Sequence, residues 1–275
     1  MTRTGLVSFR PRAGSAALGL GALLAATMTA PAAADPISLS YSIAVSGTRA
    51  MKMTFDGNVG KSAYKAHVRI KPAGFMGLFI KKSFDLSGSG RISAKGAIPA
   101  RFSMTVKKKK KARTGTITWN GGKMHWRRTP AYDQQTVASV WRAMGKGAPD
   151  PLSLLIGMAG RAPAQSCKGT RRVFDGHYVY DLKLSLRGKT AVKSAFYRGP
   201  ATICRMLYVP VAGMSEKKKR KILADPWIFN LVLIPLTSKE AGRLMAPVRA
   251  YGRVKGRNFT ASLSAASIGG RPLRP

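Results

Sequence analysis

The chain has 275 residues, and its 48 Lys and Arg outnumber its 10 Asp and Glu so strongly that the formal net charge is +38 at pH 7. Ten carboxylates in a chain of this length argue against a tight calcium site and leave few groups for acid–base catalysis. The positive potential over much of the surface favours anionic partners.

The first 34 residues differ in composition from the rest of the chain. Three arginines precede an uncharged stretch rich in Ala, Leu and Gly at residues 13–28, and the small residues at 32–34 fit the rule for a cleavage site. This pattern predicts a secretory signal peptide that is cleaved after Ala34. The alternative is an uncleaved anchor helix, since the uncharged stretch approaches the ~18 residues that can span a membrane. Pro31 and the alanines after it favour cleavage.

Cleavage would leave a mature chain that is still strongly basic. It keeps 241 of the 275 residues and +35 of the +38 charges, because the leader holds three Arg and no acidic residue. This length suffices for one large domain or two small ones with a substantial core. For a secreted protein we expect lipid head groups, lipopolysaccharide, acidic glycans or wall polymers as anionic partners, and no specific nucleic acid.

Residues 35–130 predict a first antiparallel meander. Leu39, Tyr41 and Ile43 alternate with small and polar residues, which is the period of a half-buried strand. Similar alternation, interrupted by glycine-containing turns, predicts further strands at residues 51–56, 64–71, 83–93, 98–106, 114–119 and 123–128.

A run of five lysines lies between two of these predicted strands: Lys107, Lys108, Lys109, Lys110 and Lys111. One interpretation is a contact with phosphate or carboxylate groups, because clustered ammonium groups release counterions when they meet a polyanion. The other is a solvated hairpin end, or an edge strand that lysine protects from aggregation. The sequence leaves both open.

The periodicity changes after Pro130, and residues 131–166 predict a helical insert. Apolar residues at helical spacing occur within 137–144. Asp150 and Pro151 then fit the N-cap and first position of a second short helix. This insert is the best candidate for a boundary between two lobes.

Residues 167–275 predict a second meander. Turn signals divide the segment from 168 to 209 into four predicted strands, and they occur at Asp175-Gly176, Gly188-Lys189 and Gly199-Pro200. The sequence further predicts a short basic helix at 217–223, a buried strand at 227–234 and a closing hairpin with its turn at 256–258.

Cys167 and Cys204 are the only cysteines. An exported protein meets an oxidising compartment, where an even number of cysteines normally forms disulfides. We therefore expect a disulfide that joins the two ends of this four-strand segment. The alternative is two separate buried thiols.

No sequence motif for catalysis or metal binding occurs. The three histidines, His67, His125 and His177, take outward positions of predicted strands, so we expect them at the surface. Asp175 and Asp181 are the one close pair of carboxylates in a well-patterned segment, but a turn explains the first and an outward strand position the second. The sequence therefore predicts no catalytic residue, no metal site and no cofactor.

Basic and apolar residues alternate on several predicted strands. The basic candidates for anion contacts include Arg69, Lys183, Arg187, Arg253 and Lys255. These residues form a basic face if their strands share a sheet; the alternative is that a chain this basic shows cations on every face. The inward positions carry adaptable apolar residues that either line a lipid-sized cavity or pack the core: Met51, Met53, Phe102, Met104, Met206, Tyr208, Trp227 and Phe229.

Several segments are similar to one known family. They are Cys167 to Leu182, Cys204 to Gly213 and Pro247 to Arg253, with the earlier Ser-Gly-Ser-Gly-Arg-Ile and Ile-Pro-Ala-Arg-Phe stretches. Together they resemble the family catalogued as domain of unknown function 3108, exported envelope proteins of Gram-negative bacteria. The resemblance implies a β-rich periplasmic protein and supplies no catalytic residue.

These observations predict a mainly β protein: an antiparallel curved sheet or two packed meanders, as an open or partial barrel, with two or three short helices. The expected function is non-catalytic binding of an anionic or amphipathic envelope component, and peripheral membrane contact is compatible with it. Two alternatives stay open. One is an enzyme acting on envelope lipid or glycan through Asp175, Asp181 or His177, and the other is a structural assembly partner.

Overall fold

The computed structural model describes residues 34–145, 147–239 and 242–274. The predicted signal peptide lies outside these residues, except for Ala34. None of the helices described in this range is both long and apolar enough to cross a membrane.

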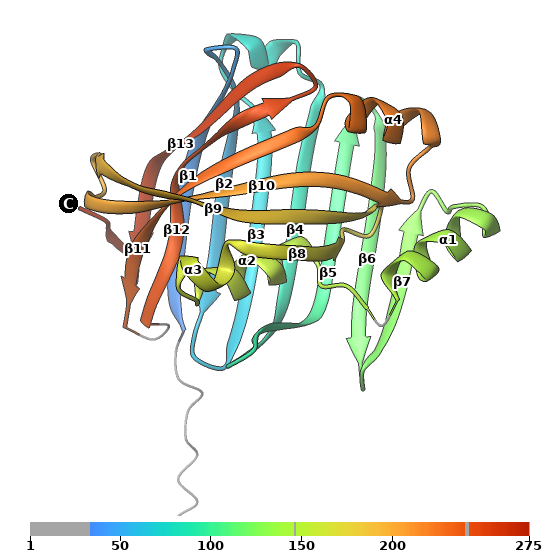
Figure 1. Ribbon diagram of the computed structural model, residues 1–275, viewed down its shortest axis with the longest axis horizontal. Coiled ribbons are helices and arrows are strands. Elements are labelled where there is room, and N and C mark those ends of the chain that lie inside the picture. Colours follow the sequence, from blue (N-terminus) through green and yellow to red (C-terminus); the bar gives the residue numbers. More distant parts are fainter. Residues whose placement is uncertain (1–33, 146, 240–241, 275) are drawn as a thin grey trace, which may run out of the picture. The chain divides into compact units, whose positions relative to one another are not determined.

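One antiparallel sheet of 14 strands accounts for most of the described residues (Figure 1). The first seven strands are β1 (Asp35–Val45), β2 (Thr48–Val59), β3 (Ala63–Pro72), β4 (Lys82–Ser93), β5 (Gly96–Lys108), β6 (Lys111–Asn120) and β7 (Lys123–Thr129). The others are β8 (Lys168–Phe174), β9 (Val179–Lys193), β10 (Arg198–Ala212), β11 (Trp227–Ser238), β12 (Gly242–Val254), β13 (Arg257–Ile268) and β14 (Arg271–Pro272). The predicted mainly β, antiparallel fold is confirmed.

The two meanders join through β1, which pairs with β2 on one side and with β13 on the other. The order across the sheet is β7-β6-β5-β4-β3-β2-β1-β13-β12-β11-β10-β9-β8, and β14 pairs with β13. Residues on one face of β1 match apolar residues of β13, such as Ile37 opposite Ile268 and Leu39 opposite Ala266. Because side chains alternate between the faces of a strand, this register keeps the apolar face of β1 continuous with that of β13.

The sheet remains open, since no ladder joins its edge strands β7 and β8 within the described residues. The two edges nevertheless meet. The indole Nε1 of Trp126 on β7 donates a hydrogen bond to the Gly176 carbonyl in the β8–β9 turn, at 2.9 Å. Gly115 on β6 packs directly against the same turn, where a Cβ atom would lie 2.7 Å from that carbonyl oxygen. Glycine is therefore required at this crossing.

The second meander has one strand fewer between residues 168 and 209 than the sequence predicted. β9 runs through Gly188 as a single strand of 15 residues. The register against β10 shifts at this point, because Gly188 pairs with Ile203 whereas Leu186 pairs with Cys204. Gly188 thus permits a bulge instead of a turn.

Four α-helices and one 3₁₀ helix accompany the sheet in the described residues. They are α1 (Gln134–Met144), α2 (Pro151–Ala159), α3 (Pro163–Ser166), α4 (Glu216–Ala224) and η1 (Phe75–Leu78). The helices expected around 137–144, after Asp150 and at 217–223 are confirmed, and Asp150 is the N-cap of α2. The sequence did not predict α3.

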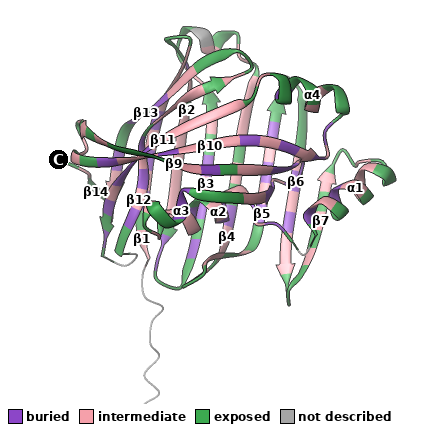
Figure 2. Ribbon diagram, viewed as in Figure 1, coloured by how far each residue is buried: buried purple, intermediate pink, exposed green. Residues whose placement is uncertain are grey.

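The main core lies between the inner face of the sheet and the helices α1 and α2. Buried and exposed residues alternate along the strands (Figure 2). Gly88 on β4 lies against Leu152 of α2, and Ala97 on β5 lies against Gly157, so α2 sits closely on this part of the sheet. A second cluster under α4 contains Tyr208 and Ile222, with Trp227 stacked on Tyr208 at a ring distance of 5.1 Å.

Candidate functional site

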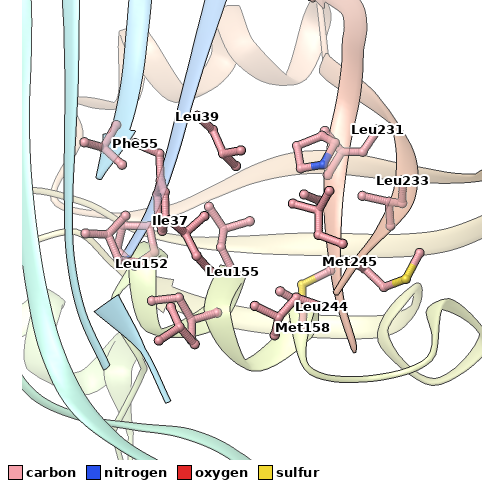
Figure 3. A pocket seen from close by; sticks show the side chains of 18 of the residues that line it. Ile37, Leu39, Phe55, Leu152, Leu155, Met158, Leu231, Leu233, Leu244 and Met245 are labelled. Atoms are coloured by element: carbon pink, nitrogen blue, oxygen red, sulfur yellow. The ribbon is translucent and has the colours of Figure 1, made fainter. Parts of the chain in front are cut away.

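An apolar cavity of about 330 Å³ lies between the first strands of the sheet, the helices α2 and α3, and the strands β11 and β12. Side chains from these groups surround it in Figure 3. The strands β1 to β4 contribute Ile37, Leu39, Tyr41, Met53, Phe55, Val59, Val68, Ile70 and Leu86. The helix α2 contributes Leu152, Leu155, Ile156 and Met158, and β11 and β12 contribute Leu231, Leu233, Leu236, Leu244, Met245 and Ala246.

The wall formed by β1 follows from its alternating sequence. Ile37, Leu39 and Tyr41 are two residues apart, so all three face the cavity. The hydroxyl of Tyr41 donates a hydrogen bond to the Pro247 carbonyl on β12 at 2.9 Å, across the intervening strand β13. Burial raises the pKa of Tyr41, so its hydroxyl stays neutral. The one polar group of this wall is thereby satisfied within the protein.

A buried polar cluster fixes α2 over the cavity. Asp150 Oδ1 accepts hydrogen bonds from the backbone N–H groups of Leu152 and Ser153, at 2.9 and 3.0 Å. The Ser153 hydroxyl donates to Asp150 Oδ2 and lies 2.5 Å from the hydroxyl of Tyr64 on β3. Burial raises the pKa of Asp150 and raises that of Tyr64 to about 12. The helix is therefore tied to the sheet at its first turn.

Leu155 marks the mouth of the cavity. Its side chain lines the cavity and is still 45 % exposed to solvent. A helix with one buried stripe does not need apolar residues on its other side, yet α2 is apolar at most of its positions. The additional apolar residues of α2 are explained by its position, because this helix borders the apolar cavity.

A smaller pocket of about 180 Å³ adjoins the cavity near the end of α2. The two hollows share Met158, Arg161 and Ser166, and the smaller one adds Lys95 and Arg171. The guanidinium of Arg161 donates to the Ala94 carbonyl at 3.2 Å. No ion pair found in the described ranges involves any of these three cations. Unneutralised positive charge therefore borders the apolar cavity.

The disulfide supports the same region. Cys167 and Cys204 are bonded, with their Cα atoms 5.5 Å apart, and both are fully buried. They cluster with Leu233, and Met158 and Met245 pack against this group. Because those three residues line the cavity, the disulfide lies directly behind its wall and ties the end of α3 to β10.

Comparison with known proteins places this chain in a family. The description "Protein of unknown function (DUF3108)" matches residues 40–236. The chain belongs to the DUF3108 family. The resemblance found in the cysteine segment and the early strands is confirmed.

A solved structure shares the fold of this DUF3108 chain. It is the crystal structure of a beta-barrel-like protein of domain of unknown function DUF1849 from Brucella abortus, with a TM-score of 0.53 and 14 % sequence identity. The match covers 85 % of this chain and 97 % of that chain. No curated protein matches.

The catalytic candidates do not line the apolar cavity or the smaller pocket beside it. Asp181 forms an ion pair with Arg172, with its Oδ1 2.5 Å from the arginine Nε. Asp175 Oδ1 accepts the backbone N–H groups of His177 and Tyr178, at 2.8 and 2.6 Å. Both aspartates and His177 lie outside the linings of these two hollows. Both aspartates therefore have structural partners.

The expected surface position was wrong for His177, which is only 3 % exposed. The turn held by Asp175 folds the ring inward, and neither ring nitrogen has a hydrogen-bond partner among the described residues. Burial lowers its pKa to about 4, and the positive charges of Arg128 and Arg113 add to this shift. His125 is exposed, and His67 is partly exposed and pairs with Asp85 at 3.0 Å.

Replacing His177 by Leu will remove an acid-labile element. The folded pKa of about 4 lies below the usual 6.5, so the unfolded chain takes up the proton first and stability is lost as the pH falls from 6.5 towards 4. Burial raises the pKa of Asp175 to about 6, so this group changes stability in the opposite direction. Its stabilising contribution is lost as the pH rises from about 4 to 6. The variant should gain about 2 kcal/mol over the wild type between pH 7 and 4.5.

Urea unfolding of both proteins at pH 4.5, 5.5 and 7 measures this gain. The exposed His125→Leu variant is the matched control for the loss of a histidine side chain. A constant difference between His177→Leu and the wild type at all three pH values would contradict the assignment.

The basic candidates of the DUF3108 chain lie on several strands and turns. Arg69 on β3 pairs with Asp56 at 3.2 Å, and Arg253 on β12 pairs with Asp225 at 3.6 Å. Lys183 and Arg187 are exposed on β9, which six strands separate from β3 in the sheet. Lys255 lies in the β12–β13 turn, and Lys107 to Lys111 form the end of the β5–β6 hairpin. These candidates are therefore spread over the sheet, although Lys108 and Lys255 both lie close enough to Lys82 to lower its pKa.

The inward apolar candidates are divided among three places. Met53 lines the cavity, whereas Phe102 and Met104 belong to the packed core and Tyr208 to the cluster under α4. The sequence did not single out the lining residues of α2, β11 and β12. For the lining residues of α2, the sequence feature that could have identified them was the unusually apolar sequence of this helix.

Proposed function

We propose that this protein binds an anionic amphiphile of the cell envelope, with an acyl chain in the apolar cavity and the head group at the adjoining basic pocket. The observation that supports this is the junction of the two hollows: an apolar cavity whose edge carries Arg161, beside Lys95 and Arg171. A ligand that fits both must be apolar at one end and anionic at the other.

The size of the cavity favours a single chain. Its volume of about 330 Å³ is at the lower end of the roughly 300–1,000 Å³ typical of ligand pockets. Each buried methylene contributes about 0.8 kcal/mol, so ten of them supply about 8 kcal/mol before the costs of association. Because a net 8 kcal/mol would correspond to about micromolar affinity, the acyl chain alone binds more weakly than that, and contacts to the head group must add to the affinity.

The proposal is tested with a fluorescent fatty acid as probe and two competitors that share one acyl chain, lysophosphatidylglycerol and lysophosphatidylcholine. The anionic competitor should displace the probe at lower concentration. Arg161→Gln should weaken displacement by the anionic competitor about tenfold, because a charge-assisted hydrogen bond to the head group is lost, and should leave the zwitterionic competitor nearly unaffected.

Arg142→Gln is the matched control, since Arg142 is exposed on α1 away from both hollows. Absence of saturable probe binding would remove the proposed function. Equal effects of the two arginine variants would remove the role of the basic pocket.

A further inference from the structure

Three large apolar side chains stand exposed in the connection between β3 and β4. Phe75, Leu78 and Phe79 are 70, 72 and 67 % exposed, and the next most exposed large apolar side chain among the described residues is Leu223, at 56 %. The rings of Phe75 and Phe79 pack edge to face, with centroids 5.7 Å apart. They therefore form a small apolar projection, here named the tip, which consists of Phe75, Leu78 and Phe79.

The backbone beneath the tip is well anchored. The N–H of Ala73 donates to the Ala50 carbonyl on β2 at 3.0 Å, and the N–H of Ile80 donates to the Gly77 carbonyl at 3.2 Å. Gly74 has a φ of 70°, and a Cβ atom there would lie 2.9 Å from the Arg49 carbonyl oxygen. The chain thus forms a defined turn whose apolar side chains face solvent, although exposed apolar groups of this size are costly in water.

Cations surround the tip. The lysine hairpin lies beside it, because the N–H of Lys109 donates to the Lys81 carbonyl at 3.0 Å. Residues 71–82 and 107–113 together hold nine Lys and Arg and no acidic residue. Burial lowers the pKa of Lys82, and the nearby charges of Lys255 and Lys218 lower it further. The β12–β13 turn and α4 therefore add positive charge at the same end of the sheet.

We propose that the tip and the lysines beside it dock the protein on the surface of an anionic lipid bilayer. The apolar side chains enter the boundary between head groups and acyl chains, and the lysines contact the lipid phosphates. An anionic bilayer has negative charge at its surface, where the lysines bind, and apolar chains directly beneath, where the tip enters. The tip and the lysines are separate from the cavity, whose lining contains none of these residues.

The test measures amide hydrogen exchange in the full chain, with and without vesicles. The readout is local, at residues 73–82, so that lipid binding elsewhere in the chain does not enter the result. On vesicles of phosphatidylglycerol and phosphatidylcholine, exchange of residues 73–82 should slow about tenfold, as expected for a segment buried at the interface. On pure phosphatidylcholine, and at high salt, this protection should be much weaker.

Two variants and one control sharpen the test. Phe75→Ser/Leu78→Ser/Phe79→Ser should abolish the protection, and Lys108→Gln/Lys110→Gln/Lys111→Gln should reduce it several-fold, each without changing thermal unfolding. Ile98→Ser removes an exposed apolar side chain from the other end of β5 and should leave the protection unchanged.

Unchanged exchange at residues 73–82 in the vesicle-bound chain would overturn the proposal. So would equal protection in the triple serine variant. If the wild type were instead a dimer in solution, and the serine variant a monomer, the tip would be an interface between two copies and the bilayer assignment would be wrong.

Discussion

Replacing Ala246 by Phe will abolish the binding of a fatty-acyl probe and leave the protein folded. Ala246 lies on β12, is buried and lines the cavity, so a phenyl ring at this position projects into space that the acyl chain requires. Loss of about half of the ten buried methylenes lowers the binding free energy by about 4 kcal/mol, which weakens affinity roughly a thousandfold. Filling empty apolar space should raise the free energy of unfolding by up to about 2 kcal/mol.

The opposite signs of these two effects make the prediction specific. Probe titration and guanidinium unfolding are measured on the same preparation. Ala201→Phe is the matched control, because Ala201 is a buried alanine on β10 that belongs to the main core but does not line the cavity. Overpacking there should cost about 1–3 kcal/mol with little change in probe affinity. Undiminished binding in Ala246→Phe would place the probe elsewhere.

Local sequence patterns predicted most of the fold, because strands and helix starts depend largely on a residue and its neighbours in the sequence. The alternation of Leu39, Tyr41 and Ile43 identified the strand and its inward face, and Asp150-Pro151 identified the start of α2. Glycine was ambiguous: Gly188 in β9 supports a bulge where the sequence suggested a turn. A bulge and a turn both use the conformational freedom of glycine, and only the pairing of β9 with β10 decides between the two.

The site was less predictable because its parts come from distant segments. The hydrogen bond between Tyr41 and Pro247 joins residues 206 apart in the sequence, and the cavity exists only once α2 covers the strands that this contact brings together. The prediction for His177 failed for a similar reason. The sequence placed it at an outward strand position, whereas in the structure it lies in a turn that Asp175 stabilises. Long-range packing decided both outcomes.

Removing the disulfide should have the largest effect on stability. In the chain-entropy treatment, opening the loop between Cys167 and Cys204 costs about 4 kcal/mol. Cys167→Ala/Cys204→Ala avoids buried hydroxyl groups, so the loss measured by guanidinium unfolding reports mainly on the lost link. Because this link ties the end of α3 to β10 behind Leu233, which lines the cavity, the folded variant should also bind the acyl probe more weakly.

Reduction provides the matched control for the double variant. Both sulfur-bearing residues are fully buried, so a reductant should not reach the bond in the native protein, and the wild type should keep its probe affinity under reducing native conditions. Unfolded in the presence of the reductant, the wild type should refold with the lower stability of the variant. A difference below about 1 kcal/mol in the free energy of unfolding between the oxidised wild type and the variant would contradict the entropic argument. Lower stability with unchanged probe affinity would show that the disulfide stabilises the meander without shaping the cavity wall.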